Sequence, residues 1–197
     1  MNQVKTASGK FTPPQFSEVI FKTSRFAEMK DWHETVTDVK AFFVRNDAKK
    51  PTWAGAYNIA FIRIFSDHPY TQVLGIFEVP AITGQADNQK GEPGMHHMQL
   101  RHANLNHLFS RYEDLRARSI TPMRCFNHGP GTSFYYRDPD GNTVELSAAN
   151  FVSEADYLAY FRSESYAKNI SGIEIDPAGY VARFRAGTPQ EELVHIE

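Results

Sequence analysis

Apolar and polar positions along this chain follow two different periods, and segments of each kind alternate. Alternation with period two predicts β-strands, and recurrence at every third and fourth position predicts amphipathic helices. The first half of the chain predicts a strand, a helix and three further strands, at residues 16–23, 24–37, 39–44, 57–65 and 71–79. We expect Ser24 to cap the helix, because its hydroxyl can accept a hydrogen bond from a free N–H group of the first turn.

The same order of elements returns in the second half. The pattern there predicts a strand, a helix, a strand and a hairpin, at residues 95–101, 104–118, 123–126, 132–137 and 143–147. A repeated order of elements indicates two modules of one architecture. The sequence therefore predicts an α+β fold with a flexible N-terminal arm, a first βαβββ module, a linker, a second βαβββ module and a helical C-terminal extension, at residues 1–12, 13–80, 81–93, 94–149 and 150–197.

The composition limits the cellular setting and the class of partner. The net charge of -2 and the pI of about 6.4 give no electrostatic basis for nucleic-acid or membrane partners. The single cysteine, Cys125, suits a reducing compartment, and no apolar run predicts a signal peptide or a membrane span, so we expect a cytoplasmic protein. Aromatic residues make up 13% of the chain, which suits a pocket for a planar, apolar ligand.

The candidate chemistry lies in the second module. His97 begins a strand, and Glu145 lies on the return strand that follows a tight turn at residues 138–142. Because side chains alternate along a strand, His97 and Gln99 share one face while Met98 takes the other. An imidazole and a carboxylate that both oppose the apolar side of their strands can converge. Such a pair is a usual start for a divalent-metal site.

These two stretches, His-His-Met-Gln-Leu at 96–100 and Asp-Pro-Asp-Gly-Asn-Thr-Val-Glu-Leu at 138–146, resemble the vicinal oxygen chelate superfamily. That superfamily includes glyoxalase I, bleomycin-resistance proteins and type I extradiol ring-cleaving dioxygenases. The resemblance extends over about residues 13–190 and is closest to short, single-chain, dioxygenase-like members. It implies that two βαβββ modules form a curled sheet around a central cavity, with the C-terminal extension packed on the outside. It also implies that His97 and Glu145 are metal ligands.

In this superfamily the first and last strands of each module can supply ligands, and here those positions are Glu18, Glu78, His97 and Glu145. Extradiol dioxygenases have a histidine at the position of Glu18. The carboxylate-rich set implied here suits a hard divalent cation, Fe(II) first and Mn(II) second. Alternatives stay open: His97 can be a hydrogen-bonded structural histidine and Glu18 a solvated strand residue. The substitution at Glu18 can also mark a member that has lost its metal.

Two further residues are candidates for proton chemistry. His128 lies in the loop before the hairpin that carries Glu145, where extradiol enzymes have an acid–base histidine, and an imidazole can move protons near neutral pH. Contacts that stabilise the loop are the alternative role for His128. Tyr135 falls where those enzymes have an active-site tyrosine and would hydrogen-bond a substrate oxygen. His96 is expected to pack beside the site rather than to bind the metal.

The function implied is a metal-dependent enzyme that acts on an aromatic or polyketide-like small molecule through chelation of vicinal oxygens. Its activity is expected to be like that of an extradiol-type ring-cleaving dioxygenase. One alternative is a glyoxalase-type isomerase or lyase that does not use O2. Another is a metal-free protein that binds and sequesters an aromatic ligand. Many superfamily members dimerise, so the resemblance also allows a homodimer.

Overall fold

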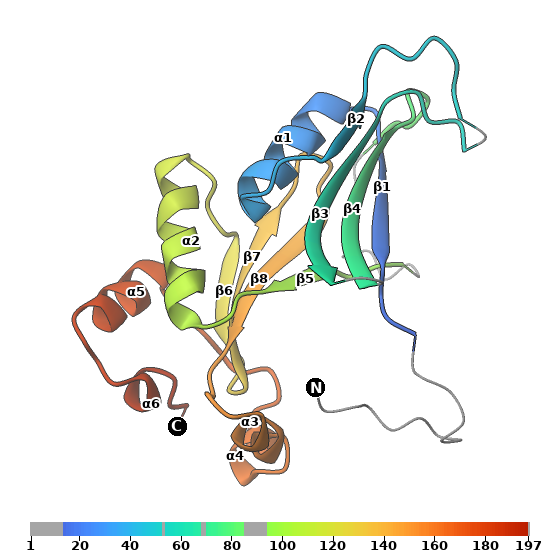
Figure 1. Cartoon of the computed structure of the whole chain (residues 1–197). Coiled ribbons are helices and arrows are strands. Elements are labelled where there is room, and N and C mark those ends of the chain that lie inside the picture. The colour runs from blue at the N-terminus through green and yellow to red at the C-terminus, as the bar shows by residue number, and fades with distance from the viewer. Residues whose placement is uncertain (1–13, 53, 68–69, 85–93, 197) are drawn as a thin grey trace. The chain divides into compact units, whose positions relative to one another are not determined.

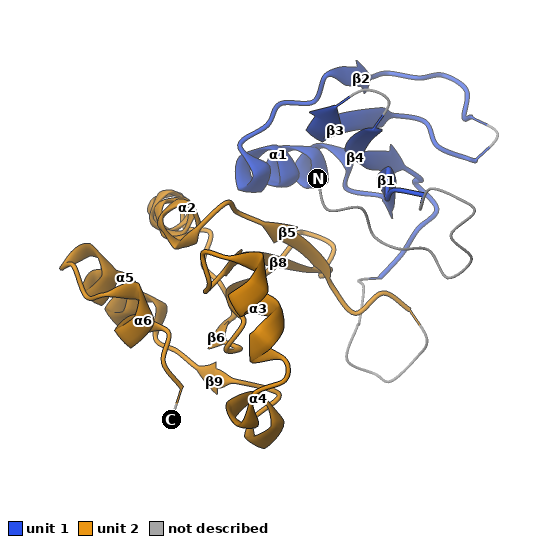
Figure 2. Ribbon diagram, turned by 60° about the horizontal axis from the view of Figure 1, so that its bottom comes forward, with its two compact units in different colours: residues 1–84 blue, residues 85–197 orange. Residues whose placement is uncertain are grey.

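The computed structural model describes residues 14–52, 54–67, 70–84 and 94–196. The chain divides into two compact units, Met1–Gly84 and Gln85–Glu197 (Figure 2), and each is described by itself. The predicted arm and most of the predicted linker lie outside the described residues. Both units combine helices with an open, mixed sheet, so the predicted α+β class is confirmed. No helix in the described ranges has the length and apolar character that crossing a membrane requires.

The described residues of the first unit form one helix and a four-stranded sheet (Figure 1). Its elements are β1 (Glu18–Thr23), α1 (Phe26–Thr37), β2 (Phe43–Arg45), β3 (Ile59–Asp67) and β4 (Tyr70–Glu78). The strand order is β1-β4-β3-β2, with β1 parallel to β4 and the other pairs antiparallel. The order strand, helix and three strands is the predicted one, although β2 is shorter than the sequence suggested.

Helix α1 packs its apolar stripe against one face of this sheet. Phe26, Met29 and Val36 are buried, and the ring of the buried His33 lies 4.9 Å from the ring of Phe21 on β1. The prediction that Ser24 caps this helix is wrong. The helix begins one residue later, after Arg25, and its cap makes no side-chain hydrogen bond.

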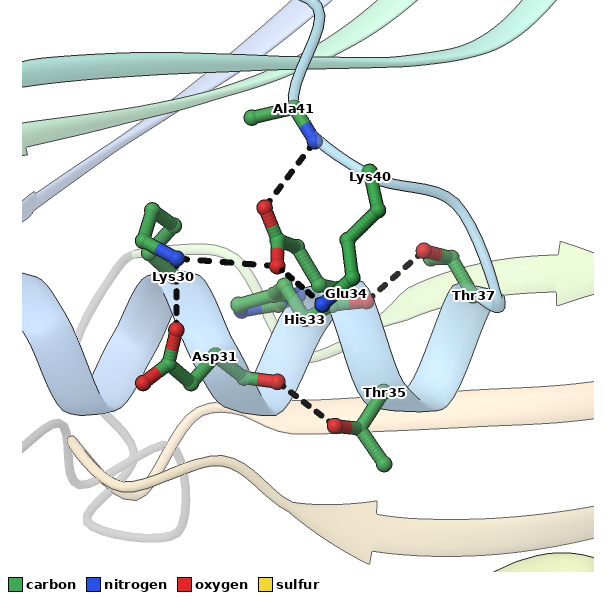
Figure 3. Close-up of polar contacts among 8 residues, drawn as sticks. All are labelled: Lys30, Asp31, His33, Glu34, Thr35, Thr37, Lys40 and Ala41. Carbon is green, nitrogen blue, oxygen red and sulfur yellow. Dashed lines mark hydrogen bonds and ion pairs between the residues drawn. The ribbon is translucent and has the colours of Figure 1, made fainter. Parts of the chain in front are cut away.

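A buried carboxylate ties α1 to the segment that leads into β2. Figure 3 shows Glu34 reaching from the helix towards Lys30, Lys40 and the backbone of Ala41. Lys40 Nζ donates to Oε2 at 2.7 Å, and the Ala41 N–H group donates to Oε1 at 3.0 Å. Burial alone raises the pKa of Glu34, but the two hydrogen bonds and the two lysine charges outweigh it and lower the pKa below its ordinary value. Glu34 is therefore held as an anion.

The second unit repeats this order and then adds to it. Its first five elements are β5 (Met98–Arg101), α2 (Leu105–Ala117), β6 (Arg124–Asn127), β7 (Gly131–Arg137) and β8 (Thr143–Ala149). Strand β5 is parallel to β8, and β8-β7-β6 are antiparallel neighbours. The Asn104 side chain caps α2 by accepting from the His107 N–H group at 3.0 Å. The buried residues of α2 recur at every third and fourth position, as the helical pattern requires, namely Leu105, Leu108, Phe109, Tyr112 and Leu115.

The turn between β7 and β8 explains the motif at residues 138–142. Asp138 Oδ1 accepts hydrogen bonds from the backbone N–H groups of Asp140 and Asn142, at 3.0 and 2.8 Å. Its Oδ2 accepts from the Asn142 side chain at 2.8 Å. Gly141 has φ of 87°, a conformation that suits glycine. The turn therefore fixes the hairpin through contacts within its own five residues.

The C-terminal extension is mainly helical but also contributes a strand. It contains α3 (Glu154–Tyr160), α4 (Glu164–Lys168), β9 (Ile173–Glu174), α5 (Pro177–Arg185) and α6 (Gln190–Leu193). Strand β9 pairs antiparallel with β6, so the second sheet has the order β5-β8-β7-β6-β9. The extension thus completes one edge of this sheet, which the sequence did not predict.

Candidate active site

The two faces of the second sheet differ in character. Phe134 on β7 contacts Phe109 and Tyr112 of α2, so the face that carries Phe134 is the one covered by that helix. The pairings Gln99↔Glu145 and Tyr135↔Glu145 place these three side chains together on the opposite face. We call this opposite face the site face. It carries Gln99 of β5, Ser133 and Tyr135 of β7, and Glu145 and Ser147 of β8.

Glu145 is the centre of the hydrogen bonding on the site face. Its side chain is 4% exposed, and a buried charge is costly unless it is well paired. Oε1 accepts from Gln99 Nε2 at 2.7 Å and from Ser133 Oγ at 2.6 Å. Oε2 lies 3.0 Å from His97 Nε2. Two neutral donors thus occupy one carboxylate oxygen and leave the other to face the imidazole.

The contacts of His97 fit the position of a metal ligand. Its Nδ1 lies 2.7 Å from His96 Nδ1, and its Nε2 faces Glu145 Oε2. In the neutral ring, Nε2–H donates to the carboxylate and Nδ1 accepts from His96, because a carboxylate oxygen can only accept. A divalent cation would replace the proton between His97 and Glu145, and nitrogen and carboxylate oxygen are suitable donors for Fe(II) or Mn(II). The ring of His96 meets the ring of His97 edge-on at 5.0 Å, and its role beside the site stays a prediction.

His128 and Tyr135 form a second pair on the site face. His128 Nε2 lies 2.9 Å from the Tyr135 hydroxyl, and Nδ1 lies 2.7 Å from the backbone carbonyl oxygen of Ser171. The ring of Phe126 stacks on His128 at 5.3 Å. Burial, reinforced by the charge of Glu145, raises the pKa of Tyr135 to about 12. Tyr135 is therefore a neutral hydrogen-bond donor at neutral pH.

The two pairs adjoin each other. The ring of Tyr135 meets the ring of His97 edge-on at 6.0 Å. Burial is the larger cause of the raised pKa of Tyr135, and the charge of Glu145 adds to it. The second unit therefore brings together four of the six residues predicted from the sequence, namely His97, Glu145, His128 and Tyr135.

The other two predicted residues, Glu18 and Glu78, belong to the first unit and lie on different faces of its sheet. Glu18 pairs with Val73 and Glu78 pairs with Thr23 in the parallel β1–β4 ladder. Glu78 thus shares the face of Phe21 and Thr23, which α1 covers, whereas Glu18 is exposed on the opposite face. Within the described ranges, no group of three or more His, Cys, Asp and Glu side chains comes together in a way that could hold a metal ion. The ligand roles of Glu18 and Glu78 remain predictions.

Three partners of the site were not predicted from the sequence: Gln99, Ser133 and the carbonyl of Ser171. Gln99 carried a signal, because it lies two residues after His97 on the same strand face. Ser133 carried the same kind of signal, because it lies two residues before Tyr135 on its strand, but only the strand register brings it to Glu145. Ser171 carried none, because its contact is made by the backbone carbonyl.

Comparison with known proteins defines the class. A family model described as Glyoxalase/Bleomycin resistance protein/Dioxygenase superfamily matches residues 18–146, and the chain belongs to this family. The match ends before the C-terminal extension begins. The fold agrees: the glyoxylase/bleomycin resistance protein/dioxygenase domain from Frankia sp. EAN1pec superposes with a TM-score of 0.53 at 15% identity, covering 70% of this chain and 99% of that one.

The chain is also similar to two relatives that are named for a particular activity. The chain is 33% identical over 180 residues to biphenyl-2,3-diol 1,2-dioxygenase 2 of Rhodococcus globerulus, which covers 91% of the chain and 86% of the relative. It is 27% identical over 180 residues to biphenyl-2,3-diol 1,2-dioxygenase 3 of the same organism, covering 91% and 87%. Both alignments are long enough to include parts of the C-terminal extension as well as the site.

Proposed function

We propose that this chain is a metal-dependent, extradiol-type ring-cleaving dioxygenase that acts on an aromatic compound with two neighbouring hydroxyl groups. The observation that carries the proposal is the contact of His97 Nε2 with Glu145 Oε2 at 3.0 Å, with the His128–Tyr135 pair beside it. The names of the two Rhodococcus relatives support an aromatic diol as the substrate class.

His97 and Glu145 would hold the metal, with Fe(II) as first choice and Mn(II) as second. A bound divalent cation supplies Lewis acidity that favours ionisation of a chelated hydroxyl and, as Fe(II), a centre that can react with O2. Gln99 and Ser133 hold Glu145 Oε1 and so fix the direction of Oε2. Glu18 as a third ligand stays a prediction from the sequence.

His128 and Tyr135 would accept a proton from the substrate and donate a hydrogen bond to one of its oxygens. His128 Nε2 accepts a hydrogen bond from Tyr135 in the free protein and would take the proton of a substrate hydroxyl as a general base. Tyr135, neutral at working pH because its pKa is raised to about 12, would donate a hydrogen bond to the oxygen that becomes anionic. Phe126 stacks on His128 and provides an aromatic surface that suits the planar ring of a substrate.

The test is O2 uptake by anaerobically Fe(II)-loaded or Mn(II)-loaded protein supplied with biphenyl-2,3-diol or catechol. We expect one O2 consumed per diol, with loss of the aromatic absorbance. His97→Ala is expected to abolish the reaction. His107→Ala, which changes an exposed histidine of α2, is the matched control and should leave it intact.

The other outcomes separate the alternatives. Metal-dependent conversion of a thiohemiacetal without O2 uptake would favour a glyoxalase-type isomerase. Binding of an aromatic diol without any turnover or metal requirement would favour a sequestration protein. Either result would contradict the proposed dioxygenase function. A homodimer and a cytoplasmic location remain predictions from the sequence.

A further inference from the structure

We infer that the segment Asn169–Gly172 of the C-terminal extension positions the His128 ring and fixes which of its nitrogens is the base. This inference rests on the proposed function, in which His128 takes a proton from the substrate. It gives a role in the chemistry to a segment that lies beyond residues 18–146, the part matched by the family.

The tautomer follows from the two hydrogen-bond partners of the ring. The Ser171 carbonyl oxygen, 2.7 Å from Nδ1, can only accept, so Nδ1 carries the proton. In the neutral ring Nε2 then has a free lone pair. The Tyr135 hydroxyl, 2.9 Å away and neutral, donates to that lone pair. Both contacts are satisfied by one neutral tautomer, in which the basic nitrogen faces Tyr135.

The β6–β9 ladder brings the Ser171 carbonyl to the ring. Phe126 pairs with Glu174 and Asn127 with Ile173, so the next step of this antiparallel ladder brings Gly172 beside His128. A side chain at Gly172 would collide with the backbone of Asn127 and His128, and its φ is +77°. Glycine at this position therefore allows the close approach that lets the preceding carbonyl reach Nδ1.

Asn169 holds the segment in this shape from outside the site. Its Oδ1 accepts from the Gly172 N–H group at 2.9 Å, and its Nδ2 donates to the Gly172 carbonyl at 3.1 Å. Both bonds are made to the backbone of Gly172, whose N–H group belongs to the same peptide unit as the Ser171 carbonyl, and the Ser171 side chain takes part in neither. Asn169 is thus a positioning residue that acts through the backbone of Ser171.

The backbone of the His128 loop is held separately. Asn127 Oδ1 accepts from the Gly129 N–H group at 2.9 Å and from Asn150 Nδ2 at 2.9 Å. The Asn150 side chain also donates to the Gly129 carbonyl at 2.9 Å. None of these bonds involves Asn169. A change at Asn169 is therefore expected to release the imidazole from its orientation without unfolding the loop.

The experiment measures the tautomer directly in the full-length chain. Protein labelled with 15N-histidine gives long-range 1H–15N correlations that report which ring nitrogen is protonated, and His128→Gln identifies the signals of His128. We expect an Nδ1–H tautomer in the wild-type protein. Asn169→Ala should shift His128 towards the Nε2–H form and lower kcat for the diol by at least about tenfold. KM and metal content should be unchanged.

Two further variants serve as controls. Ser171→Ala keeps the backbone carbonyl and should match the wild type in tautomer and kcat. Asn169→Asp keeps an acceptor for the Gly172 N–H group and should restore part of both readouts. An Nε2–H tautomer in the wild type, or an Asn169→Ala protein with wild-type tautomer and kcat, would overturn the inference.

The experiment distinguishes failure of the proposed function from failure of the positioning role. If the chain cleaves no diol, the spectra still decide the positioning: the Nδ1–H form in the wild type and its loss in Asn169→Ala would support it. Unchanged spectra in Asn169→Ala would overturn the positioning even in a protein that consumes O2 with a diol.

Discussion

Glu145 Oε2 and His97 Nε2 lie 3.0 Å apart, although Glu145 comes from β8 and His97 from the residue just before β5. The parallel pairing of β5 with β8 sets Gln99 opposite Glu145 and thereby brings His97 to the same carboxylate. The other oxygen of Glu145 is already occupied by Gln99 and Ser133. One oxygen of Glu145 is therefore held in place by two side chains, and the other is directed at the imidazole of His97.

Removing either member of this pair should abolish metal retention. His97→Ala and Glu145→Gln are expected to lose the divalent ion, because each removes one of two adjacent donors. Elemental analysis of protein purified without chelators measures this, and circular dichroism verifies the fold. His107→Ala should retain the metal. Wild-type metal content in both site variants would contradict the assignment.

The donors to Glu145 Oε1 should tune metal affinity without binding the metal. Ser133→Ala and Gln99→Leu are each expected to weaken affinity by about 10-fold to 100-fold, because the carboxylate loses its fixed orientation. Ser147→Ala is the matched control: Ser147 is buried on the same face, and its hydroxyl has no hydrogen-bond partner in the described part of the chain. Equilibrium titration with Mn(II) compares the three. Equal losses in all three would indicate a general packing effect instead.

Tyr135→Phe should reduce kcat by about 100-fold while changing KM little, because the lost hydroxyl donates where negative charge develops. The pKa of about 12 also predicts that this phenol stays neutral throughout the working range. The ultraviolet difference spectrum between wild type and variant should therefore show tyrosinate only near pH 12. Tyr70→Phe, which changes an exposed residue at the start of β4 in the other unit, should leave kcat unchanged. Ionisation of Tyr135 near its ordinary pKa of 10 would contradict the raised pKa.

Glu34→Gln should destabilise the first unit at neutral pH by about 1–2 kcal/mol, because hydrogen bonds to a charged group are lost. Lys40 is 86% exposed, so most of this effect is assigned to the Ala41 N–H group and Lys30. The folded pKa of Glu34 lies below its ordinary value of 4.5. Its contribution is therefore fully present above about pH 4.5 and is lost as the pH falls through the lowered value.

Urea denaturation at pH 7 and pH 3 tests whether the stabilisation by Glu34 is lost on acidification. Both tryptophans, Trp32 and Trp53, belong to the first half of the sequence, so their fluorescence follows this unit. The difference between wild type and Glu34→Gln should shrink at pH 3. Glu28→Gln, an exposed residue of the same helix, should change stability by less than about 0.5 kcal/mol at either pH. A difference that grows on acidification would contradict the lowered pKa.

The sequence predicted most of the fold because most of its strands and helices leave a regular pattern of apolar and polar positions. Period-two and helical patterns located both strand–helix–strand series, and the self-contained turn at Asp138 marked the hairpin. Short elements were missed for a physical reason. Strand β9 has two residues, too few to show a period, and depends on its partner β6. The cap at Ser24 failed because the helix begins after Arg25.

The alternation of side chains along a strand was enough to predict that His97 and Glu145 lie on the same face of the sheet. It could not set the register between β5 and β8, which decides that Gln99 reaches Glu145. It also could not reveal that Glu18 and Glu78 take opposite faces of the first sheet, because that depends on how β1 and β4 pair. Backbone groups such as the Ser171 carbonyl leave no trace in side-chain patterns.

The parallel pairing of β5 with β8 has a consequence for the order of folding. The β7–β8 hairpin closes a short loop and can form early, whereas β5 must wait for a long-range pairing that encloses the whole module. We therefore expect Glu145 and Ser133 to come together before His97 and Gln99 join them. We expect the nascent chain to have no competent cation site until the module has closed, so that ion capture reports completed folding.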